Sequence, residues 1–255
     1  MEKKSVKVVI PIYKTGLSEL EMRSLQQACK VLKPYPKVIV KPESLDLSSL
    51  EAAFPALTCQ PFDDGYFKGI AGYNRLMLSP DFYAAFRDTE YILIYQPDAY
   101  VFRDELTEWC AKGYDYIGAP WLKRPVYNKP LVSELMSFFR WLDRLRGKAN
   151  KQSLYNKIGN GGLSLRKVES HYQAARQFGS RIESFLDRKH HLFNEDVFWA
   201  TVPDFRYPEV SEALDFAFDK YPGYCYRLKN NTLPFGCHGW YKRKMKRFWQ
   251  PVIGF

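Results

Sequence analysis

The stretch that most constrains the fold is the apolar run YILIY at residues 91–95, which leads directly into Gln96, Pro97 and Asp98. Five apolar residues without a polar break are typical of a strand that is buried on both faces of a sheet. Because proline cannot donate to a central ladder, this strand must end near Pro97. The run therefore predicts Asp98 at the carboxyl end of a buried strand, where open α/β sheets bind their ligands.

A carboxylate in this position has two interpretations. Asp98 can bind a divalent cation, which in turn can bridge the phosphates of a diphosphate. Alternatively, Asp98 closes a turn or caps the helix that we expect near residue 104, as turn aspartates commonly do. The strand by itself does not favour either interpretation.

Strand-like and helix-like segments alternate along the chain. Strands are predicted at residues 6–10, 37–40, 57–60, 91–95 and 114–121. Helices are predicted at residues 17–32, 42–53, 65–86, 131–147 and 167–187, with Ser18 and Ser44 as candidate N-caps and a break at Ser79 and Pro80. This alternation predicts one α/β domain with a Rossmann-like, mostly parallel central sheet flanked by helices.

Composition narrows the class of protein. The 255 residues are 46% hydrophobic and 16% aromatic, which supports a packed core and excludes a disordered chain. The five cysteines are scattered without a CxxC pair, as expected for reduced thiols rather than disulfides or a zinc site. No apolar run approaches the roughly 20 residues of a membrane span, and the first residues lack a signal-peptide core, so we expect a cytoplasmic protein.

The net charge of +10 indicates an anionic partner: a phosphorylated ligand, a membrane surface or a nucleic acid. We expect no nucleic acid, because no known nucleic-acid-binding motif occurs in the sequence. Basic and aromatic residues alternate near the end of the chain, which suits an anionic membrane surface: Lys242, Arg243, Lys244, Lys246 and Arg247. A solvated basic face is an equally good interpretation of this segment.

Five motifs occur in an order that resembles a known family. They are residues 11–13 (PIY), 95–99 (YQPDA), 159–162 (GNGG), 194–196 (NED) and 235–240 (FGCHGW). Together they resemble nucleotide-sugar-dependent glycosyltransferases of the GT-A fold. They are most similar to an uncharacterised bacterial glycosyltransferase-like family linked with surface polysaccharide synthesis. The resemblance implies one GT-A-like domain over residues 1–255, with a nucleotide-binding half (1–120), an acceptor-binding half (121–240) and a basic aromatic tail (241–255).

The resemblance also implies a divalent metal, Mn²⁺ or Mg²⁺, on the donor diphosphate. GT-A enzymes hold it with an Asp-x-Asp segment, of which Asp98 matches the second acid while Gln96 replaces the first. Glutamine offers only a neutral oxygen, so the sequence departs from the pattern here. His238 matches a late histidine that completes the metal sphere, and imidazole is an acceptable ligand for manganese. The alternative is a histidine that is hydrogen-bonded within an aromatic core near Trp240.

Two adjacent acids, Glu195 and Asp196, are the candidates for catalysis. They lie at a predicted helix start with Asn194 as cap, where acids also simply offset the helix dipole. Sugar transfer with inversion needs a base to accept the proton of the acceptor hydroxyl. The resemblance assigns this role to the second acid, which is Asp196.

The remaining candidates concern the nucleotide sugar. We expect the donor to contact residues at three positions that the resemblance indicates, Pro11, Ile12, Tyr13 and Lys14, then Gln96, Pro97 and Asp98, then Asn160, Gly161 and Gly162. Asn74 and Arg75, on the helix predicted at residues 65–86, are further candidates. Tyr13 can stack on uracil, and Lys14 or Arg75 can meet a phosphate. The alternatives are a surface arginine at Arg75 and a plain tight turn at residues 159–162.

We therefore expect a metal-dependent, inverting glycosyltransferase with a donor that is a uridine diphosphate sugar and a saccharide acceptor that is lipid-linked. Such a protein would be peripheral on the inner face of the cell membrane. One rival is a sugar nucleotidyltransferase, although residues 11–16 match its Gly-rich, basic segment poorly. The other is a non-catalytic, membrane-associated saccharide-binding protein, which Gln96 favours. Metal-dependent hydrolysis of a nucleotide sugar would distinguish an enzyme from a binding protein.

Overall fold

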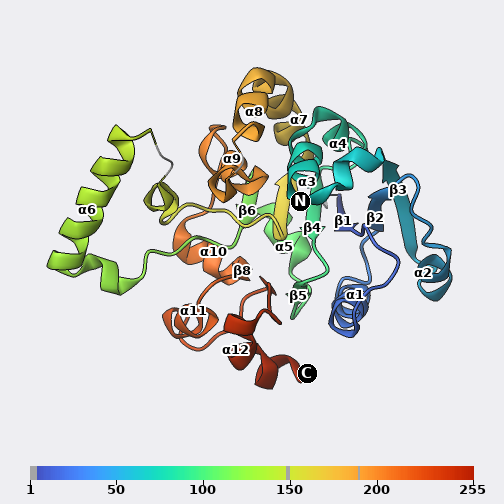
Figure 1. The fold of residues 1–255 in the computed structure, drawn as a ribbon. Coiled ribbons are helices and arrows are strands. Elements are labelled where there is room, and N and C mark those ends of the chain that lie inside the picture. Colours follow the sequence, from blue (N-terminus) through green and yellow to red (C-terminus); the bar gives the residue numbers. More distant parts are fainter. Residues whose placement is uncertain (1–4, 148–149, 189) are drawn as a thin grey trace.

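A six-stranded sheet forms the centre of the computed structural model, which describes residues 5–147, 150–188 and 190–255 (Figure 1). Its strand order is β3-β2-β1-β4-β7-β6. The strands are β1 (Val6–Pro11), β2 (Lys37–Pro42), β3 (Leu57–Phe62), β4 (Tyr91–Tyr95), β6 (Tyr116–Gly118) and β7 (Leu163–Lys167). The first four run parallel, whereas β7 is antiparallel to both of its neighbours. The prediction of a mostly parallel central sheet flanked by helices is confirmed.

Helices cover both faces of this sheet. One face carries α1 (Glu19–Val31), α2 (Ser48–Ala53), α5 (Leu106–Ala111) and α10 (Val210–Phe216). The other carries α3 (Gly69–Leu78), α4 (Pro80–Ala84), α7 (Val168–Gln177), α8 (Gly179–Leu186) and α9 (Glu195–Thr201). All five residues of β4 are buried, because a hydrophobic core lies against each face of this strand.

Local signals account for several helix starts. Ser18 is the N-cap of α1, as predicted, and it forms a complete capping box with Glu21. Ser79 caps α4 through its side chain, so the expected break at this position is confirmed. The prediction of a helix from residue 42 is wrong, since β2 continues to Pro42 and α2 begins only at Ser48. The backbone N–H of Ser44 instead donates to Asp64.

The segment after residue 202 is more regular than its sequence pattern indicated. A second, three-stranded sheet has the order β5-β9-β8, with β5 (Ala99–Val101), β8 (Ala217–Phe218) and β9 (Gly236–His238). Two helices pack near it: α11 (Pro222–Leu228) and α12 (Arg243–Ile253). Trp249 of α12 is fully buried beside Phe102 and Phe218, so the expected basic tail is a packed amphipathic helix.

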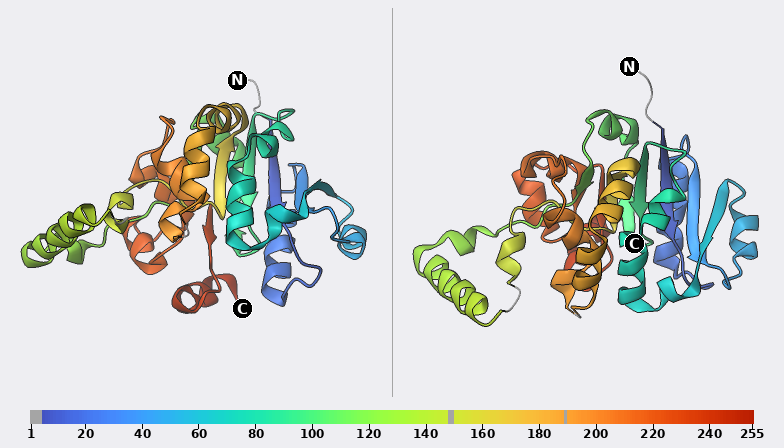
Figure 2. Two further views of the ribbon diagram at one scale, coloured as in Figure 1. Left: turned by 45° about the horizontal axis from the view of Figure 1, so that its top comes forward. Right: turned by 90° about the horizontal axis from the view of Figure 1, so that it is seen from above.

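One helix, α6 (Pro130–Leu145), projects away from both sheets in every view (Figure 2). Short 3₁₀ turns complete the fold: η1 (Asp64–Phe67), η2 (Pro125–Asn128), η3 (Lys151–Leu154) and η4 (His191–Phe193). In the part of the chain that the structure describes, no helix combines the length and the apolar character that crossing a bilayer requires.

Candidate active site

Three strand ends meet at one edge of the main sheet. β1 and β4 are neighbouring parallel strands, so the residues that follow them leave the sheet at the same edge. β7 is antiparallel to β4, and its first residue, Leu163, lies opposite Tyr95. The N–H of Gln96 donates to the carbonyl of Gly162 at 2.8 Å, which joins the end of β4 to the loop before β7. Residues that are far apart in the sequence are thereby brought to one place.

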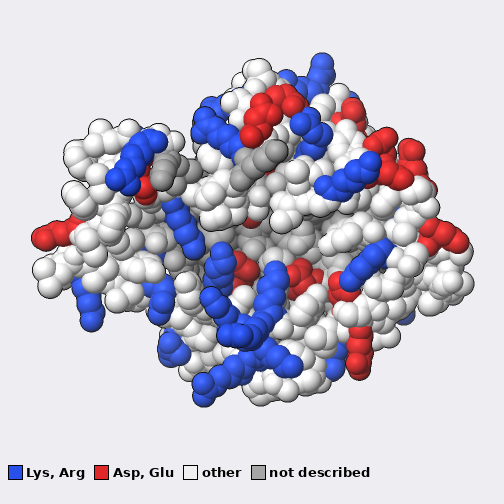
Figure 3. Space-filling view, viewed as in Figure 1, with Lys and Arg blue, Asp and Glu red and all other residues white. Residues whose placement is uncertain are grey.

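A cavity of about 590 Å³, the large cavity, lies at this edge. On the same face Lys and Arg side chains gather beside a hollow in which acidic side chains are visible (Figure 3). Fourteen of the residues that the sequence indicated line the large cavity: Pro11, Ile12, Tyr13, Lys14, Asn74, Gln96, Pro97, Asp98, Asn160, Gly161, Gly162, Glu195, Asp196 and His238.

Arg75 is not among them, and its predicted role in the donor site needs correction. Its guanidinium pairs with Glu183 at 3.0 Å, and both side chains are about half exposed. Asn74, the neighbour of Arg75 on α3, lines the cavity instead. Successive residues of a helix point in different directions, so only one of the two can face the site.

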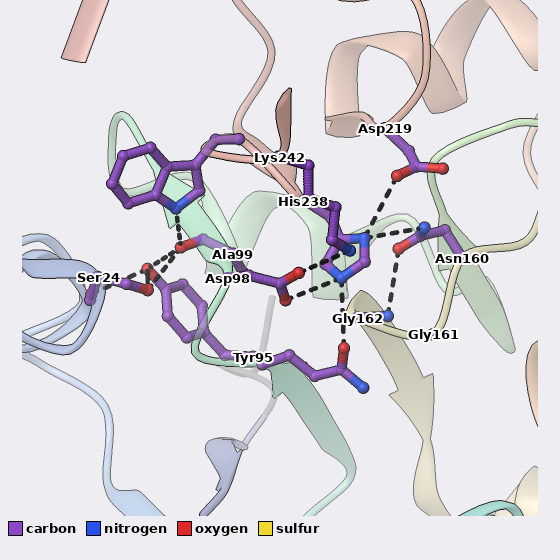
Figure 4. A network of polar contacts seen from close by, with 12 residues as sticks. Ser24, Tyr95, Asp98, Ala99, Asn160, Gly161, Gly162, Asp219, His238 and Lys242 are labelled. Carbon is purple, nitrogen blue, oxygen red and sulfur yellow. Dashed lines mark hydrogen bonds and ion pairs between the residues drawn. The ribbon is translucent and has the colours of Figure 1, made fainter. Parts of the chain in front are cut away.

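The large cavity holds a histidine between two carboxylates (Figure 4). β9 pairs with β5, the strand that follows Asp98, and this pairing brings His238 beside Asp98. His238 Nε2 lies 3.0 Å from Asp98 Oδ1 and 3.3 Å from Gln96 Oε1. His238 Nδ1 lies 3.3 Å from Asp219 Oδ1. The other oxygen of Asp98 pairs with Lys242 Nζ at 2.8 Å.

These contacts determine which side chains of the His238 cluster carry a proton. Burial by itself would lower the pKa of His238, but the carboxylates of Asp98 and Asp219 outweigh it and raise this pKa to about 9. Burial would raise the pKa of Asp98, yet the charges of His238 and Lys242 hold it far below its usual range. The hydrogen bond and charge of His238 likewise lower the pKa of Asp219 against the effect of burial. At neutral pH the cluster therefore contains two carboxylates, an imidazolium and an ammonium.

The donors in this cluster fit a divalent cation of the Mn²⁺ or Mg²⁺ type. A carboxylate oxygen, the amide oxygen of Gln96 and an imidazole nitrogen converge, which are hard or borderline ligands suited to these metals. The other nitrogen of His238 faces Asp219, the arrangement in which carboxylates orient ligating histidines. Within the described residues no three His, Cys, Asp or Glu side chains gather to hold a metal. A metal at Asp98 therefore depends on oxygens from a bound ligand, such as a diphosphate.

Two glycines make room for the functional side chains. A Cβ on Gly162 would lie 2.2 Å from His238 Nε2, and one on Gly161 would lie 2.0 Å from Glu195 Oε1. Neither glycine has a positive φ; the left-handed residue of this loop is Asn160, with φ 68°. Close approach, and not unusual backbone geometry, is thus the reason for glycine at both positions.

The two acids of α9 have different surroundings. Glu195 is buried and its Oε2 lies 3.0 Å from Nη2 of Arg166, which is itself fully buried in β7. Asp196 is half-buried, accepts the N–H of Val197 at 2.9 Å, and forms no ion pair with a Lys or Arg in the described part of the chain. Burial and the nearby charge of Glu195 raise the pKa of Asp196 to about 7. Asp196 can therefore accept a proton near neutral pH, as a general base must.

Asn74 and Asn194 line the large cavity and also hold the start of α9. Asn74 accepts the N–H of Glu195 at 3.1 Å and lies 3.2 Å from the side-chain oxygen of Asn194. Asn194 occupies the N-cap position of α9, but its side chain makes no capping hydrogen bond. Asn194 is therefore the N-cap residue by position, as predicted, while its side chain bonds to Asn74.

A second cavity of about 280 Å³, the small cavity, adjoins the first. Asn194 and Asp196 line both cavities, so Asp196 lies at their boundary. The small cavity has aromatic walls and basic side chains: Trp121, Tyr127, Tyr155, Tyr221, Arg124, Lys151, His191 and Lys220. Aromatic faces suit sugar rings, and basic side chains suit an anionic group.

Sequence reasoning missed two residues of the cluster. Asp219 follows the two-residue strand β8, just as Asp98 follows β4, but so short a strand has no detectable periodicity. Lys242 was assigned to a membrane-binding tail, whereas it lines the large cavity and pairs with Asp98. Only the pairing of β9 with β5 brings Lys242 to this place.

The fold is the GT-A fold, which several solved glycosyltransferases share. The galactosyltransferase LgtC, solved with donor and acceptor sugar analogues, matches with a TM-score of 0.58 at 12% identity, over 97% of this chain and 95% of that one. Mouse xyloside xylosyltransferase 1 matches with a TM-score of 0.52 at 13% identity, over 92% and 97%. Core-mannan synthase A from Aspergillus fumigatus, solved in a Mn/GDP form, matches with a TM-score of 0.50 at 9% identity, over 78% and 69%.

The sequence places the chain in a particular family. A family model described as protein of unknown function (DUF5672) matches residues 56–238, and the chain belongs to that family. The matched segment includes Asp98, both acids of α9 and His238. No curated protein matches the chain in sequence.

Proposed function

We propose that the protein is a glycosyltransferase that moves a sugar from a nucleoside diphosphate donor to a saccharide acceptor. The observation that carries this proposal is the arrangement around Asp196. A base with a pKa of about 7 lies at the boundary of two cavities, and the larger of them contains an Asp98–His238 cluster suited to a metal-bound diphosphate. The GT-A fold supports the same conclusion.

The donor would lie in the large cavity. Tyr13 is 59% exposed at the end of β1 and can stack on a base, for which we propose uracil. Lys14 and Lys242 reach the cavity with side chains that are about half exposed. An ammonium that pairs with a carboxylate in the free protein can exchange this partner for a phosphate oxygen. Residues 1–120 would thus supply most of the nucleotide site, with Lys242 added from the end of the chain.

Asp98, Gln96 and His238 would hold Mn²⁺ or Mg²⁺, and Asp219 would orient His238 from behind. When bound, the cation neutralises charge on the diphosphate leaving group. Lys242 can offset part of the same charge from the protein side. The neutral oxygen of Gln96 makes the protein donor set less negative than a pair of aspartates would.

The acceptor would lie in the small cavity, with its reacting hydroxyl at Asp196. Asp196 would take the proton of that hydroxyl as it attacks the anomeric carbon in a single displacement, which inverts the configuration. Glu195 forms an ion pair with Arg166 and lies directly against Gly161. We therefore assign it the role of positioning the first turn of α9 and the loop that contains Gly161. Lys151 and Lys220 suit the phosphate of a lipid-linked saccharide, as used in bacterial surface polysaccharide synthesis.

Thermal stabilisation by a panel of nucleotide sugars, with and without Mn²⁺, tests this proposal. A ligand at about 100 times its dissociation constant adds roughly 2.7 kcal/mol to the free energy of unfolding, which is readily measured. We expect Mn²⁺-dependent stabilisation by a uridine diphosphate sugar, together with slow hydrolysis of that sugar. Stabilisation without any turnover would favour a saccharide-binding protein, and no stabilisation by any nucleotide sugar would refute the proposal. The anomeric configuration of the product, read by NMR, tests inversion separately.

A further inference from the structure

The outer surface of α6 is unlike that of the other long helices. None of its sixteen residues is buried, and the helix projects from the body of the molecule (Figure 2). Its largest side chains are nevertheless apolar: Leu131, Leu135, Phe138, Phe139, Trp141 and Leu145 are between 51% and 83% exposed. So large an exposed apolar surface on a folded domain marks an interaction site.

The apolar side of α6 points away from the protein. The partly covered residues Val132, Met136 and Asp143 lie at spacings of four and seven, which is one side of a helix. Another side of the helix carries Leu131 and the residues four and seven positions after it, Leu135 and Phe138. This side is exposed. An amphipathic helix usually buries its apolar stripe against the core, whereas α6 presents it to solvent.

Contacts with the segment that follows α6 hold the helix in this orientation. Gln152 Nε2 donates to the carbonyl of Met136 at 2.7 Å. Asn150 also hydrogen-bonds to Asp143 on the partly covered side. The exposed apolar side is therefore a defined surface of the fold.

The charge around α6 is strongly basic. Residues 123–151 contain eight Lys and Arg residues against two acids. Arg140 and Arg144 are exposed one turn apart on the polar side of α6, opposite Leu131, Leu135 and Phe138. The most exposed tryptophan in the described part of the chain, Trp141, lies on the apolar side and stacks against Phe138.

We propose that α6 docks the protein on an anionic lipid bilayer. The helix would lie in the plane of the interface, with its apolar side among the acyl chains and its arginines at the headgroups. Trp141 and Phe138 suit this depth, because amphipathic aromatic rings prefer the boundary between headgroups and hydrocarbon. The docking surface consists of Leu131, Leu135, Phe138, Phe139, Trp141 and Leu145. Arg140 and Arg144 lie on the polar side of the same helix, as basic residues do in helices that lie in a membrane interface.

The basic charge favours a bilayer over a second copy of the chain. In a symmetric dimer the same surface meets itself, so the basic segments of both copies would face each other. Like charges across such a contact repel, whereas anionic headgroups attract them. The surface is also distinct from α12, whose Trp249 is buried in the protein and cannot enter a membrane.

Docking by α6 would bring the small cavity close to the bilayer. The turns on either side of α6 contribute to this cavity, through Tyr127 of η2 and Lys151 and Leu154 of η3. An acceptor anchored in the membrane could then reach Asp196 from the bilayer surface. This consequence rests on the proposed function, but membrane docking itself does not.

Vesicle sedimentation tests the docking surface directly. The full-length protein would be mixed with vesicles of phosphatidylcholine and phosphatidylglycerol, and with vesicles of phosphatidylcholine alone. The test variant is Leu135→Ser/Phe138→Ser/Trp141→Ser, in which only exposed side chains change. Leu228→Ser is the matched control, because Leu228 is 48% exposed on α11, away from α6. Unchanged thermal unfolding would show that both variants are folded.

We expect the wild type and the control to bind the anionic vesicles, and the triple variant to lose roughly tenfold or more for each large side chain removed. Arg140→Glu/Arg144→Glu should weaken binding to anionic vesicles by about fivefold or more per residue. Tryptophan fluorescence should shift to the blue on binding, and Trp141→Phe should abolish the shift while binding persists. Equal binding by the wild type and the triple variant would overturn the proposal. So would absence of binding, or a dimer in solution that the triple substitution dissociates.

Discussion

Replacement of Asp196 by asparagine should stabilise the fold while it removes catalysis. The pKa of Asp196 is raised from 3.8 to about 7 by burial and by the charge of Glu195. The folded state therefore holds the proton of Asp196 to a higher pH than the unfolded chain does. Its contribution to stability is complete below about pH 4 and is lost as the pH rises through 7. Asparagine carries no charge, so Asp196→Asn should escape this loss.

The size of the effect follows from the same pKa. A difference between 3.8 and about 7 corresponds to at most roughly 4 kcal/mol, at about 1.4 kcal/mol per pKa unit. Asp196 is half-buried, so water screens part of this penalty, and we expect a gain of about 1–3 kcal/mol above pH 7. The side-chain oxygen of asparagine can still accept the N–H of Val197, so this contact is retained. At pH 4 the variant and the wild type should be equally stable.

The neighbouring acid provides a matched control. Glu195→Gln leaves the guanidinium of Arg166 buried without a charged partner, which typically costs about 3–5 kcal/mol. Loss of the carboxylate should therefore raise the free energy of unfolding at Asp196 and lower it at Glu195, although the two residues are adjacent in α9.

Urea unfolding at pH 4 and pH 8, for the wild type and both variants, measures these differences. Transfer activity should fall by about 10²–10⁴-fold in Asp196→Asn, with little change in donor affinity. A destabilised Asp196→Asn at pH 8, or a stability change that is the same at both pH values, would refute the reasoning about burial. Near-normal turnover would remove Asp196 as the base.

Two further predictions concern the cluster around His238. Manganese needs a neutral imidazole, and the pKa of His238 is about 9, so Mn²⁺-dependent nucleotide binding should strengthen from pH 7 to pH 9. Calorimetric titration would show the rise, which should vanish in His238→Ala and in Asp98→Asn; a pH-independent affinity in the wild type would contradict it. Gly162→Ala places a methyl group 2.2 Å from His238 Nε2, so it should cost about 1–3 kcal/mol in urea unfolding and weaken metal-dependent binding. Gly16→Ala, which meets no atom within 4 Å, should change neither, and an unaffected Gly162→Ala would show that His238 can move aside.

The sequence alone determined the features that depend on residues close together along the chain. The unbroken apolar run of β4 indicated a strand that is buried on both faces. Pro97 has no N–H to donate to a neighbouring strand, so the strand had to end there and Asp98 had to follow its end. Ser18 was likewise recognisable as the N-cap of α1, because a serine side chain can accept a backbone N–H of the first turn. The order of the motifs indicated the GT-A fold, which the solved structures share.

Only the tertiary structure decided which side chains meet. Lys242 and Asp219 reach the cluster through strand pairings between distant segments, and no local pattern encodes those pairings. Arg75 turned out to face Glu183 rather than the cavity, since helix packing sets the direction of each side chain. Periodicity predicted a helix over residues 131–147 but could not tell that its apolar side faces solvent, because burial depends on what the rest of the chain packs against it.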